Sequence, residues 1–410
     1  MADDALTEER AAPARPWRGL PVAVQIGAYY LVARLVTTGF LVVAAQMSGA
    51  TSRFGENATI ADLMVGWDAQ WYWYTALNGY PTTMPLTESG GVAENSWAFM
   101  PIYAYLSNGL GWIMGSWGAA AVLVSLVAGY GASVTLYRML RPRLDHSAAL
   151  WAVVFFTAGP LAAMFQVGYA ESLFLLWLFL SLLMVIRRRY VWLYLLIPLM
   201  AFTRPGVLAF ALFLALFGIW RWIRREIEPL RTAEVVHLIA LAALATVTGF
   251  AWQVAAGVVT GDPGAYLATE LAWRRNWLPD TAGAFVPFEG FLQATAFWFT
   301  TWGLGEVTGY VALALGVAAL AAALILLPAA RRVGVEVRLW SASYLLYLLA
   351  VFFPQSSIFR LLLPLSPLWG VVAVPRSRGW RVGVLLLCLL GQWWWIYNMY
   401  ALGNTYWQIP

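Results

Sequence analysis

The stretch that decides the fold class is residues 170–189, AESLFLLWLFLSLLMVIRRR. After Glu171, an uncharged apolar run that ends in three arginines is typical of a membrane-spanning helix that reaches the cytosolic face. The rest of the chain agrees, because 61% of its 410 residues are apolar and only 11% are charged. A soluble domain has about 45–50% apolar and about 25% charged residues. The chain is therefore not a soluble enzyme, a disordered protein or a disulfide-stapled secreted module, and we predict an all-α polytopic membrane protein.

Further apolar runs extend this prediction to about 11 transmembrane helices. The candidate spans lie near residues 21–48, 117–137, 147–167, 170–186, 190–202, 205–220, 235–259, 306–328, 338–353, 359–374 and 381–400. Two of them, 190–202 and 205–220, are short and are joined by Thr203-Arg204-Pro205-Gly206. We expect this turn to lie within the membrane thickness and to face protein or water, because lipid cannot satisfy its backbone groups.

Arginine placement predicts the orientation. The chain contains no lysine, and nineteen of its 25 arginines fall in the N-terminal segment or in every second connection between spans. They are Arg10, Arg15, Arg18, Arg138, Arg141, Arg143, Arg187, Arg188, Arg189, Arg221, Arg224, Arg225, Arg231, Arg331, Arg332, Arg338, Arg376, Arg378 and Arg381. The positive-inside rule places these segments in the cytosol. We predict a multi-pass plasma-membrane protein with a disordered cytosolic tail over 1–20, a single membrane domain over 21–410, and long outer loops over 49–116 and 260–305.

Six arginines lie outside the cytosolic set: Arg34, Arg53, Arg204, Arg274, Arg275 and Arg360. Arg34 interrupts the first span, Arg204 occupies the short turn and Arg360 opens a span. Charged side chains at membrane depth are costly and commonly functional, which makes these three functional candidates. Arg204, in the short turn, needs either an anion or structural partners such as backbone carbonyls. Arg274 and Arg275 form either an anion contact or a solvated turn.

The first outer loop contains Gly66-Trp67-Asp68-Ala69-Gln70-Trp71-Tyr72-Trp73-Tyr74, which predicts an aromatic helix at the membrane surface. Helical spacing places Asp68 and Tyr72 on one face. One interpretation is an aromatic belt beside a solvated carboxylate. The other is a carboxylate held among rings that suit the C–H faces of a sugar, where partial burial fits it to act as a base.

Two more outer segments carry polar residues or cover the loop. Glu171, in Tyr169-Ala170-Glu171-Ser172, opens a span near membrane depth. One interpretation is that Glu171 stabilises the first turn of a helix, where a negative charge is favourable. The other is that its carboxylate bonds to the first outer loop or to substrate. Residues 97–106 are apolar but too short to span, so we expect a re-entrant or interfacial helix there. Gln355 precedes Arg360 and is a further candidate.

Several chemistries are excluded. His146 and His237 both fall on the cytosolic side, so the outer face has no histidine for zinc or for catalysis. The chain has no phosphate-binding glycine loop followed by lysine, and no cytosolic segment is long enough for a nucleotide-binding domain. Cys388 is the only cysteine, and the positive charges are too scattered for nucleic-acid binding.

The outer motifs, in order, resemble the PIG-V-like mannosyltransferases of the GT-C glycosyltransferase superfamily. They are Trp67-Asp68, Gly79-Tyr80, Phe99-x-Pro101, Tyr169-x-Glu171-Ser172, Thr203-Arg204-x-Gly206 and the RLLLPLSPL stretch from Arg360 to Leu368. The resemblance implies a GT-C-like fold with interfacial helices in the first outer loop, and transfer of mannose from a polyprenyl- or dolichyl-phosphate. For an actinobacterial relative, which the lysine-free Ala/Gly/Arg/Val-rich composition suggests, it implies a lipid or cell-envelope glycan acceptor. Gly66 and Pro205 depart from the pattern, since we expect a polar or basic residue at the first and a small or polar one at the second.

The resemblance and the residues together predict the roles. Asp68 is the base of an inverting transfer, and Arg204 and Arg360 bind the donor phosphate. The expected substrate-binding residues are Trp67, Gln70, Tyr72, Tyr169, Glu171, Ser172 and Gln355, with Arg34, Arg274 and Arg275 as further candidates. We expect no cofactor and no metal, because arginines can neutralise the phosphate. Asp62, Glu56 and Glu306 leave a Ca²⁺ or Mg²⁺ site open as an alternative.

Three other functions remain open on the sequence alone. The chain could transfer another sugar, such as glucose or arabinose, from a similar lipid phosphate. It could transport or flip a lipid-linked sugar, using the same arginines and aromatic residues without a base. It could also be a non-catalytic subunit of a membrane assembly. Asp68 discriminates, because only a transferase requires its carboxylate.

Overall fold

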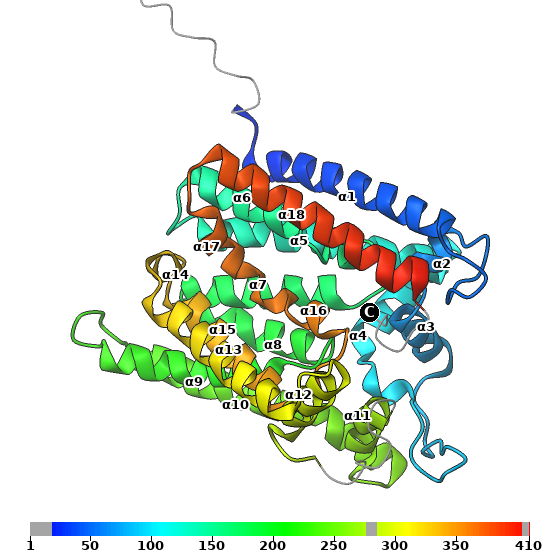
Figure 1. Cartoon of the computed structure of the whole chain (residues 1–410). Coiled ribbons are helices and arrows are strands. Elements are labelled where there is room, and N and C mark those ends of the chain that lie inside the picture. Colours follow the sequence, from blue (N-terminus) through cyan, green and yellow to red (C-terminus); the bar gives the residue numbers. More distant parts are fainter. Residues whose placement is uncertain (1–18, 276–284, 404–409) are drawn as a thin grey trace, which may run out of the picture.

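The computed structural model describes residues 19–275, 285–403 and 410, and helices dominate these residues (Figure 1). The predicted cytosolic tail over 1–20 lies almost entirely outside the described residues. In chain order the α-helices are α1 Val22–Gln46, α2 Ile60–Met64, α3 Asp68–Asn78, α4 Pro101–Met114, α5 Trp117–Leu140, α6 His146–Thr157, α7 Glu171–Ile186, α8 Leu193–Ala201, α9 Val207–Ile223, α10 Thr232–Thr260, α11 Ala265–Arg275, α12 Glu289–Thr301, α13 Glu306–Leu326, α14 Pro328–Arg332, α15 Val335–Val351, α16 Ile358–Leu361, α17 Trp369–Ala373 and α18 Arg378–Ile396. Short 3-10 helices cover Ser96–Ala98 (η2), Ala162–Phe165 (η3), Tyr190–Trp192 (η4) and Leu363–Leu368 (η6), and a π-helix covers Tyr397–Leu402 (η7).

Five of the described helices are long and apolar enough to cross a membrane: α1, α5, α10, α13, and α18 with its continuation to Leu402. Five shorter apolar segments accompany them: His146–Thr157, Glu171–Ile186, Tyr190–Ala201, Val207–Ile223 and Leu363–Ala373. Large apolar side chains on the long helices point away from the protein, as on α10, α13 and α18. This pattern suits lipid-facing surfaces and supports a multi-pass membrane protein.

Two predicted spans are not continuous helices, so the sequence interpretation was wrong there. The span predicted over 147–167 contains α6, which ends at Thr157, and then the separate short helix η3. The span predicted over 359–374 is divided into α16, η6 and α17. Pro160 follows the end of α6, and Pro364 and Pro367 lie within η6. Proline lacks the backbone N–H that continues a helix, which accounts for these breaks.

α7 lies at the centre of the bundle and packs against α5, α8, α15 and η3. Its side chains are buried along most of its length, including Phe174, Leu178 and Phe179. The first outer loop, with α2, α3 and α4, gathers with α11 at one end of the bundle (Figure 1). The connections predicted to be cytosolic lie at the opposite end, as the alternation of the spans requires.

The turn between α8 and α9 interrupts the apolar helices where the sequence predicts it. α8 ends at Ala201 and α9 begins at Val207, and Gly206 between them has φ +135°. A side chain at this φ would be strained, and a Cβ there would also lie 3.3 Å from the ring of Phe174. Glycine therefore allows the chain to turn tightly against α7 and places Arg204 beside the first residue of that helix.

Candidate functional site

Four charged side chains from distant parts of the chain meet at the N-terminal end of α7, the end predicted to face outside, and we call them the outer cluster: Asp68, Glu171, Arg204 and Arg360. Nη1 of Arg360 donates hydrogen bonds to Oδ2 of Asp68 and to Oε1 of Glu171, the second over 3.1 Å. Nη1 of Arg204 forms an ion pair with the same Oε1 of Glu171. Two guanidinium groups and two carboxylates give the cluster no net charge.

Each member of the outer cluster is positioned by a helix end, a short helix or a turn. Asp68 and Glu171 are the first residues of α3 and α7, where a negative charge is favourable because the helix N-terminus carries a partial positive charge. Arg204 lies in the turn between α8 and α9, and Arg360 lies on the single-turn helix α16. The cluster therefore links four segments that the sequence separates.

The outer cluster is mostly buried, but to different degrees. The side chain of Glu171 is 4% exposed and that of Asp68 is 23% exposed. Asp68 is thus the more accessible carboxylate of the pair. Oε2 of Glu171 and Nε of Arg360 are buried without a hydrogen-bond partner in the described part of the chain, which leaves one acceptor and one donor available to a ligand.

A cavity of about 10 Å³ lies between Glu171, Arg204 and Arg360, with Phe174 and Tyr344 on its wall. This volume holds about one water molecule. A phosphate group is larger, so it reaches both guanidinium groups only when the ion pairs of the outer cluster open. Any anion that binds here competes directly with Asp68 and Glu171.

Trp67 directs Asp68 into the outer cluster. Its backbone has φ +53° and ψ −124°, a conformation that is costly for a residue with a side chain. Three contacts hold it: Nε1 donates to the carbonyl of Met399 over 3.0 Å, the guanidinium of Arg53 lies 4.5 Å from the ring centroid, and Phe54 packs edge-on. In the structure, the indole of Trp67 therefore serves to position Asp68. Its predicted contact with substrate stays a prediction.

Gly66, one of the two departures from the family pattern, has a steric reason in this chain. A Cβ at this position would collide with the ring of Phe54 and would lie 3.0 Å from the carbonyl of Asp62. Phe54 in turn packs against Trp67. A polar or basic side chain at position 66 therefore requires a different packing of the loop.

The tyrosines predicted to bind substrate line the inner side of the outer cluster. The ring of Tyr169 lies below Arg360, with 5.6 Å between Cζ and the ring centroid, and its hydroxyl accepts a hydrogen bond from the backbone N–H of Asp68 over 3.3 Å. Tyr72 is 4% exposed and packs against Phe99 and Tyr103. Tyr169 thus holds the backbone of Asp68, while Tyr72 packs in the aromatic layer next to it.

Ser172, Gln70 and Gln355 differ in their surroundings. Ser172 is buried, and its hydroxyl donates to the carbonyl of Met164, which ties α7 to η3. Gln70 is exposed on α3 and accepts a 3.4 Å hydrogen bond from Arg53. Gln355 lies in the segment before α16, where its carbonyl accepts from the backbone N–H of Ile358. Their predicted contacts with substrate stay predictions.

Arg34 is not part of the outer cluster. It is 5% exposed, and its guanidinium donates to the carbonyls of Thr157 and Ala162. These carbonyls lie at the break between α6 and η3, where a helix end leaves acceptors that need donors. The rings of Tyr30 and Phe165 also lie beside the guanidinium, at 5.1 and 5.4 Å from their centroids. Arg34 thus stabilises the break that the sequence interpretation missed.

Arg274 and Arg275 end α11 and have different partners. Arg274 is 8% exposed, with the ring centroid of Phe353 5.7 Å from Cζ. Burial lowers the pKa of Arg274, while the charge of Glu289 raises it. Arg275 donates to the carbonyl of Val92 and so ties the second outer loop to the first. Residues 276 and 277 of the predicted turn lie outside the described residues.

Glu270 is a further carboxylate near the site, which the sequence interpretation missed. It lies on α11, outside the membrane-spanning helices, and it is exposed to solvent. Protein atoms near the carboxylate raise the pKa of Glu270 to about 7, while a hydrogen bond with Tyr266, the positive charge of Arg204 and the exposure of the side chain oppose the shift. Its spacing of four residues from Tyr266 on a short amphipathic helix was the available signal.

No group of three or more His, Cys, Asp or Glu side chains could hold a metal ion among the residues that the structure describes. Of the carboxylates that left a metal site open, Asp62 caps α2. The hydroxyl and backbone N–H of Thr59 bond to it and hold the pKa of Asp62 below its usual value. Glu56 is exposed, and Glu306 opens α13. The expectation of a metal-free site stays a prediction.

Comparisons with known proteins give a fold likeness only. No family model and no curated protein matches the chain. Two crystal structures of the Archaeoglobus fulgidus oligosaccharyltransferase are similar to it, each with a TM-score of 0.46. The one with Zn and sulfate is 15% identical and is matched over 92% of this chain and 53% of its own. The one tethered to an acceptor peptide is 13% identical, with 97% and 56% covered. The chain thus spans about half the length of these structures, and at this similarity the match carries no argument about activity.

Proposed function

We propose that the chain is an integral membrane mannosyltransferase. It transfers mannose from a polyprenyl-phosphate to a lipid-linked or cell-envelope glycan acceptor on the extracytoplasmic face. The observation that carries this proposal is the outer cluster, in which a partly exposed carboxylate, Asp68, lies beside two arginines at the outer end of the bundle. The order of the motifs that resemble PIG-V-like enzymes supports the choice of mannose.

The location of the outer cluster determines the kind of donor. A nucleotide-activated sugar is not available outside the cytosol, so the sugar must arrive on a lipid phosphate. The leaving group is then a phosphate ester, which is a weak base and needs no general acid. The site needs a base for the incoming hydroxyl and cations for the phosphate. Asp68 supplies the first, and Arg204 and Arg360 supply the second.

The proposed step is a single in-line displacement. The hydroxyl oxygen of the acceptor forms a bond to C1 of the mannose, and the bond from C1 to the phosphate oxygen breaks with its electron pair going to the phosphate. The hydroxyl proton goes to Asp68. One displacement inverts the anomeric centre, so a β-linked phosphomannose yields an α-mannoside. Holding the hydroxyl about 3 Å from C1 removes much of the entropic part of the barrier.

The hydrogen bonds of Arg360 suggest how donor binding prepares the base. Arg360 neutralises Asp68 in the outer cluster. A donor phosphate that draws this guanidinium to itself leaves the carboxylate of Asp68 free to accept a proton. Glu171 remains behind both arginines and holds them in place during the step. The base is thus released only when its donor is bound.

Aromatic residues beside α3 give the sugar a surface. Trp71 stacks on Phe99 with 5.6 Å between ring centroids, and Trp273 from the second outer loop packs edge-on against both. Trp71 and Trp273 are partly exposed. Their faces suit the C–H side of a hexose, which is consistent with a sugar bound between the two outer loops.

The test is turnover by the purified protein reconstituted in vesicles. The substrates are radiolabelled polyprenyl-phosphate-mannose and an extract of candidate lipid acceptors. We expect label in a new, slower-migrating lipid or glycan. Faster transfer from polyprenyl-phosphate-glucose or polyprenyl-phosphate-arabinose would show that the donor sugar is not mannose. If intact donor moves across the vesicle membrane and Asp68→Asn does not affect this movement, the protein is a transporter and not a transferase.

A further inference from the structure

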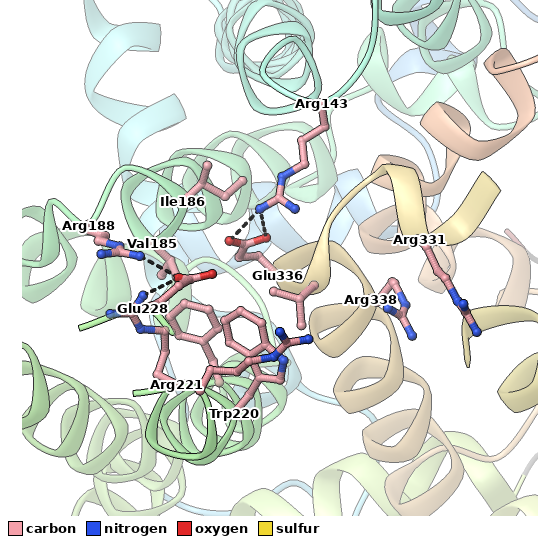
Figure 2. Close-up of a pocket in the computed structure, with 13 residues that line it drawn as sticks. Arg143, Val185, Ile186, Arg188, Trp220, Arg221, Glu228, Arg331, Glu336 and Arg338 are labelled. Carbon is pink, nitrogen blue, oxygen red and sulfur yellow. Dashed lines mark hydrogen bonds and ion pairs between the residues drawn. The ribbon is translucent and has the colours of Figure 1, made fainter. Parts of the chain in front are cut away.

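A pocket of about 380 Å³ lies at the opposite end of α7 from the outer cluster (Figure 2). We call it the inner pocket. Six arginines line it: Arg143, Arg188, Arg221, Arg224, Arg331 and Arg338. All of them belong to connections that the positive-inside rule places in the cytosol. α7 has 16 residues, so its two ends are about 24 Å apart, and the inner pocket is separate from the proposed transfer site.

The carboxylates of the inner pocket neutralise only part of this charge. Glu336 pairs with Arg143 over 2.9 Å, and Glu228 pairs with Arg188 and Arg221, each over 2.9 Å (Figure 2). Six arginines and two glutamates leave the lining with a net charge of +4. An anion is the ligand that this lining favours.

The remaining three arginines pair with no carboxylate in the described segments. Arg331 and Arg338 both donate to carbonyls at the end of α13, and Cζ of Arg224 lies 5.7 Å from the ring centroid of Trp220. Backbone carbonyls and a ring orient a guanidinium without cancelling its charge. These arginines therefore keep donors for an anion.

The inner pocket is more than a solvated basic surface. Arg221 is only 1% exposed, although it belongs to the cytosolic set, and its Nε is buried without a hydrogen-bond partner in the described segments. Arg332 and Arg378 are exposed, as Arg224 and Arg331 of the lining are, but they lie outside the pocket. Its own partners hold Arg221 in place: Glu228, Glu234 over 3.2 Å and the carbonyl of Pro229, so the guanidinium is a fixed part of the pocket wall.

Apolar residues indicate which kind of anion fits. Val185, Phe217 and Trp220 form part of the lining. Next to it, Ile223 at the end of α9 is 71% exposed and Leu326 at the end of α13 is 62% exposed, as expected for side chains in contact with lipid. A phosphate that carries acyl chains matches both the charged interior and this apolar rim. Basic pockets between helices on the cytosolic side of membrane proteins suit such headgroups.

We propose that the inner pocket binds the phosphate headgroup of an anionic phospholipid from the cytosolic leaflet. The proposal does not depend on the transfer reaction at the outer face. Guanidinium groups bind phosphate oxygens through paired, charge-assisted hydrogen bonds. Arg224, Arg331 and Arg338 supply these bonds, and Arg221 holds the wall behind them.

The test measures lipid retention by native mass spectrometry of the full chain, released from nanodiscs of phosphatidylcholine with phosphatidylglycerol. Arg331→Gln combined with Arg338→Gln removes two charges from the pocket. The matched control, Arg332→Gln combined with Arg378→Gln, removes two charges from the same face outside it. We expect the pocket variant to hold phosphatidylglycerol about tenfold more weakly and the control to stay within about twofold of wild type, at salt that screens exposed charges.

Several results would overturn the proposal. These are equal losses in both variants, or retention of phosphatidylcholine as strong as that of phosphatidylglycerol. Because the pocket variant also removes bonds to α13, Arg224→Gln serves as a second variant, and it must weaken retention as well. Inorganic phosphate and pyrophosphate form the last arm: a thermal shift with them that the pocket variant loses, without phosphatidylglycerol retention, would assign the pocket to a soluble anion instead of a lipid.

Discussion

Arg360 and Asp68 are 292 positions apart in the sequence, yet Nη1 of Arg360 donates a hydrogen bond to Oδ2 of Asp68 at the outer end of the bundle. The same nitrogen bonds Glu171 over 3.1 Å. The proposed base is therefore paired with a proposed phosphate-binding group. Activity, donor affinity and metal dependence each test a different part of this arrangement. The pH dependence of stability tests the neighbouring carboxylate of Glu270.

Asp68→Asn is expected to abolish sugar transfer while the protein still folds and binds donor. Asparagine keeps the shape of the side chain but cannot accept the hydroxyl proton, and loss of a general base costs about 10²–10⁴ in rate. Single-turnover transfer in detergent measures the effect, with Glu88→Gln as the control because Glu88 is an exposed outer carboxylate. A rate above about a tenth of wild type, a change below about 1.4 kcal/mol in barrier, would exclude Asp68 as the base.

Arg204→Lys and Arg204→Ala should both weaken donor binding, with alanine worse. Lysine keeps the charge beside Glu171 but cannot form the paired hydrogen bonds of a guanidinium with phosphate. A hydrogen bond to a charged group is worth about 1.5–3 kcal/mol, which predicts a loss of tenfold or more in affinity for the alanine variant. Equilibrium binding of labelled donor gives the comparison. Unchanged affinity in both variants would leave Arg204 as a partner of Glu171 alone.

Excess EDTA should leave sugar transfer unchanged. Two arginines neutralise the phosphate in the proposed step, so the leaving group needs no divalent cation. The assay compares initial rates of the reconstituted protein with and without chelator. Lost activity that returns with Mg²⁺, Mn²⁺ or Ca²⁺ would show that a metal supplies the charge, with Glu56 and Glu306 as the first ligands to test.

Glu270 should make the stability of the protein fall as the pH rises from about 4.5 to about 7. Its pKa in the folded protein, about 7, is above the ordinary value of 4.5 because nearby protein atoms disfavour the charged form, although the side chain is exposed. The stabilisation is therefore complete below the ordinary pKa and is lost as the pH passes the folded value. Glu270→Gln should flatten this slope and melt higher than wild type at pH 8. Parallel pH profiles of the apparent melting temperature would contradict the assignment.

The apolar runs predicted most of the fold because each long helix in lipid is encoded locally. α1, α5 and α7 begin or end within a few residues of the predicted spans, and the turn at Arg204 lies where two short runs meet. The breaks after Thr157 and after Leu361 were missed although prolines mark them. Hydropathy continues across these positions, because the broken segments remain buried in apolar surroundings.

The sequence named the members of the outer cluster but not their pairing. Motif order and the cost of charge at membrane depth pointed to Asp68, Glu171, Arg204 and Arg360, and the structure brings their side chains into contact. The cost of a charge at membrane depth also pointed to Arg34. The partners of Arg34 are backbone carbonyls, which become available only because α6 ends at Thr157. Partners of that kind, and the approach of α11 to Arg204, depend on tertiary packing and leave no local pattern.

The closed, neutral outer cluster has a consequence for selectivity. Binding of an anion at Arg204 or Arg360 is an exchange reaction, so its affinity is the difference between the new contacts and the carboxylate contacts that are given up. Chloride or free phosphate at millimolar concentration offers charge alone and gains little over Asp68 and Glu171. A donor that also brings a sugar ring and an isoprenoid tail adds contacts that a small ion lacks. In the proposed function, the ion pairs of the outer cluster thus keep abundant inorganic anions away from Arg204 and Arg360.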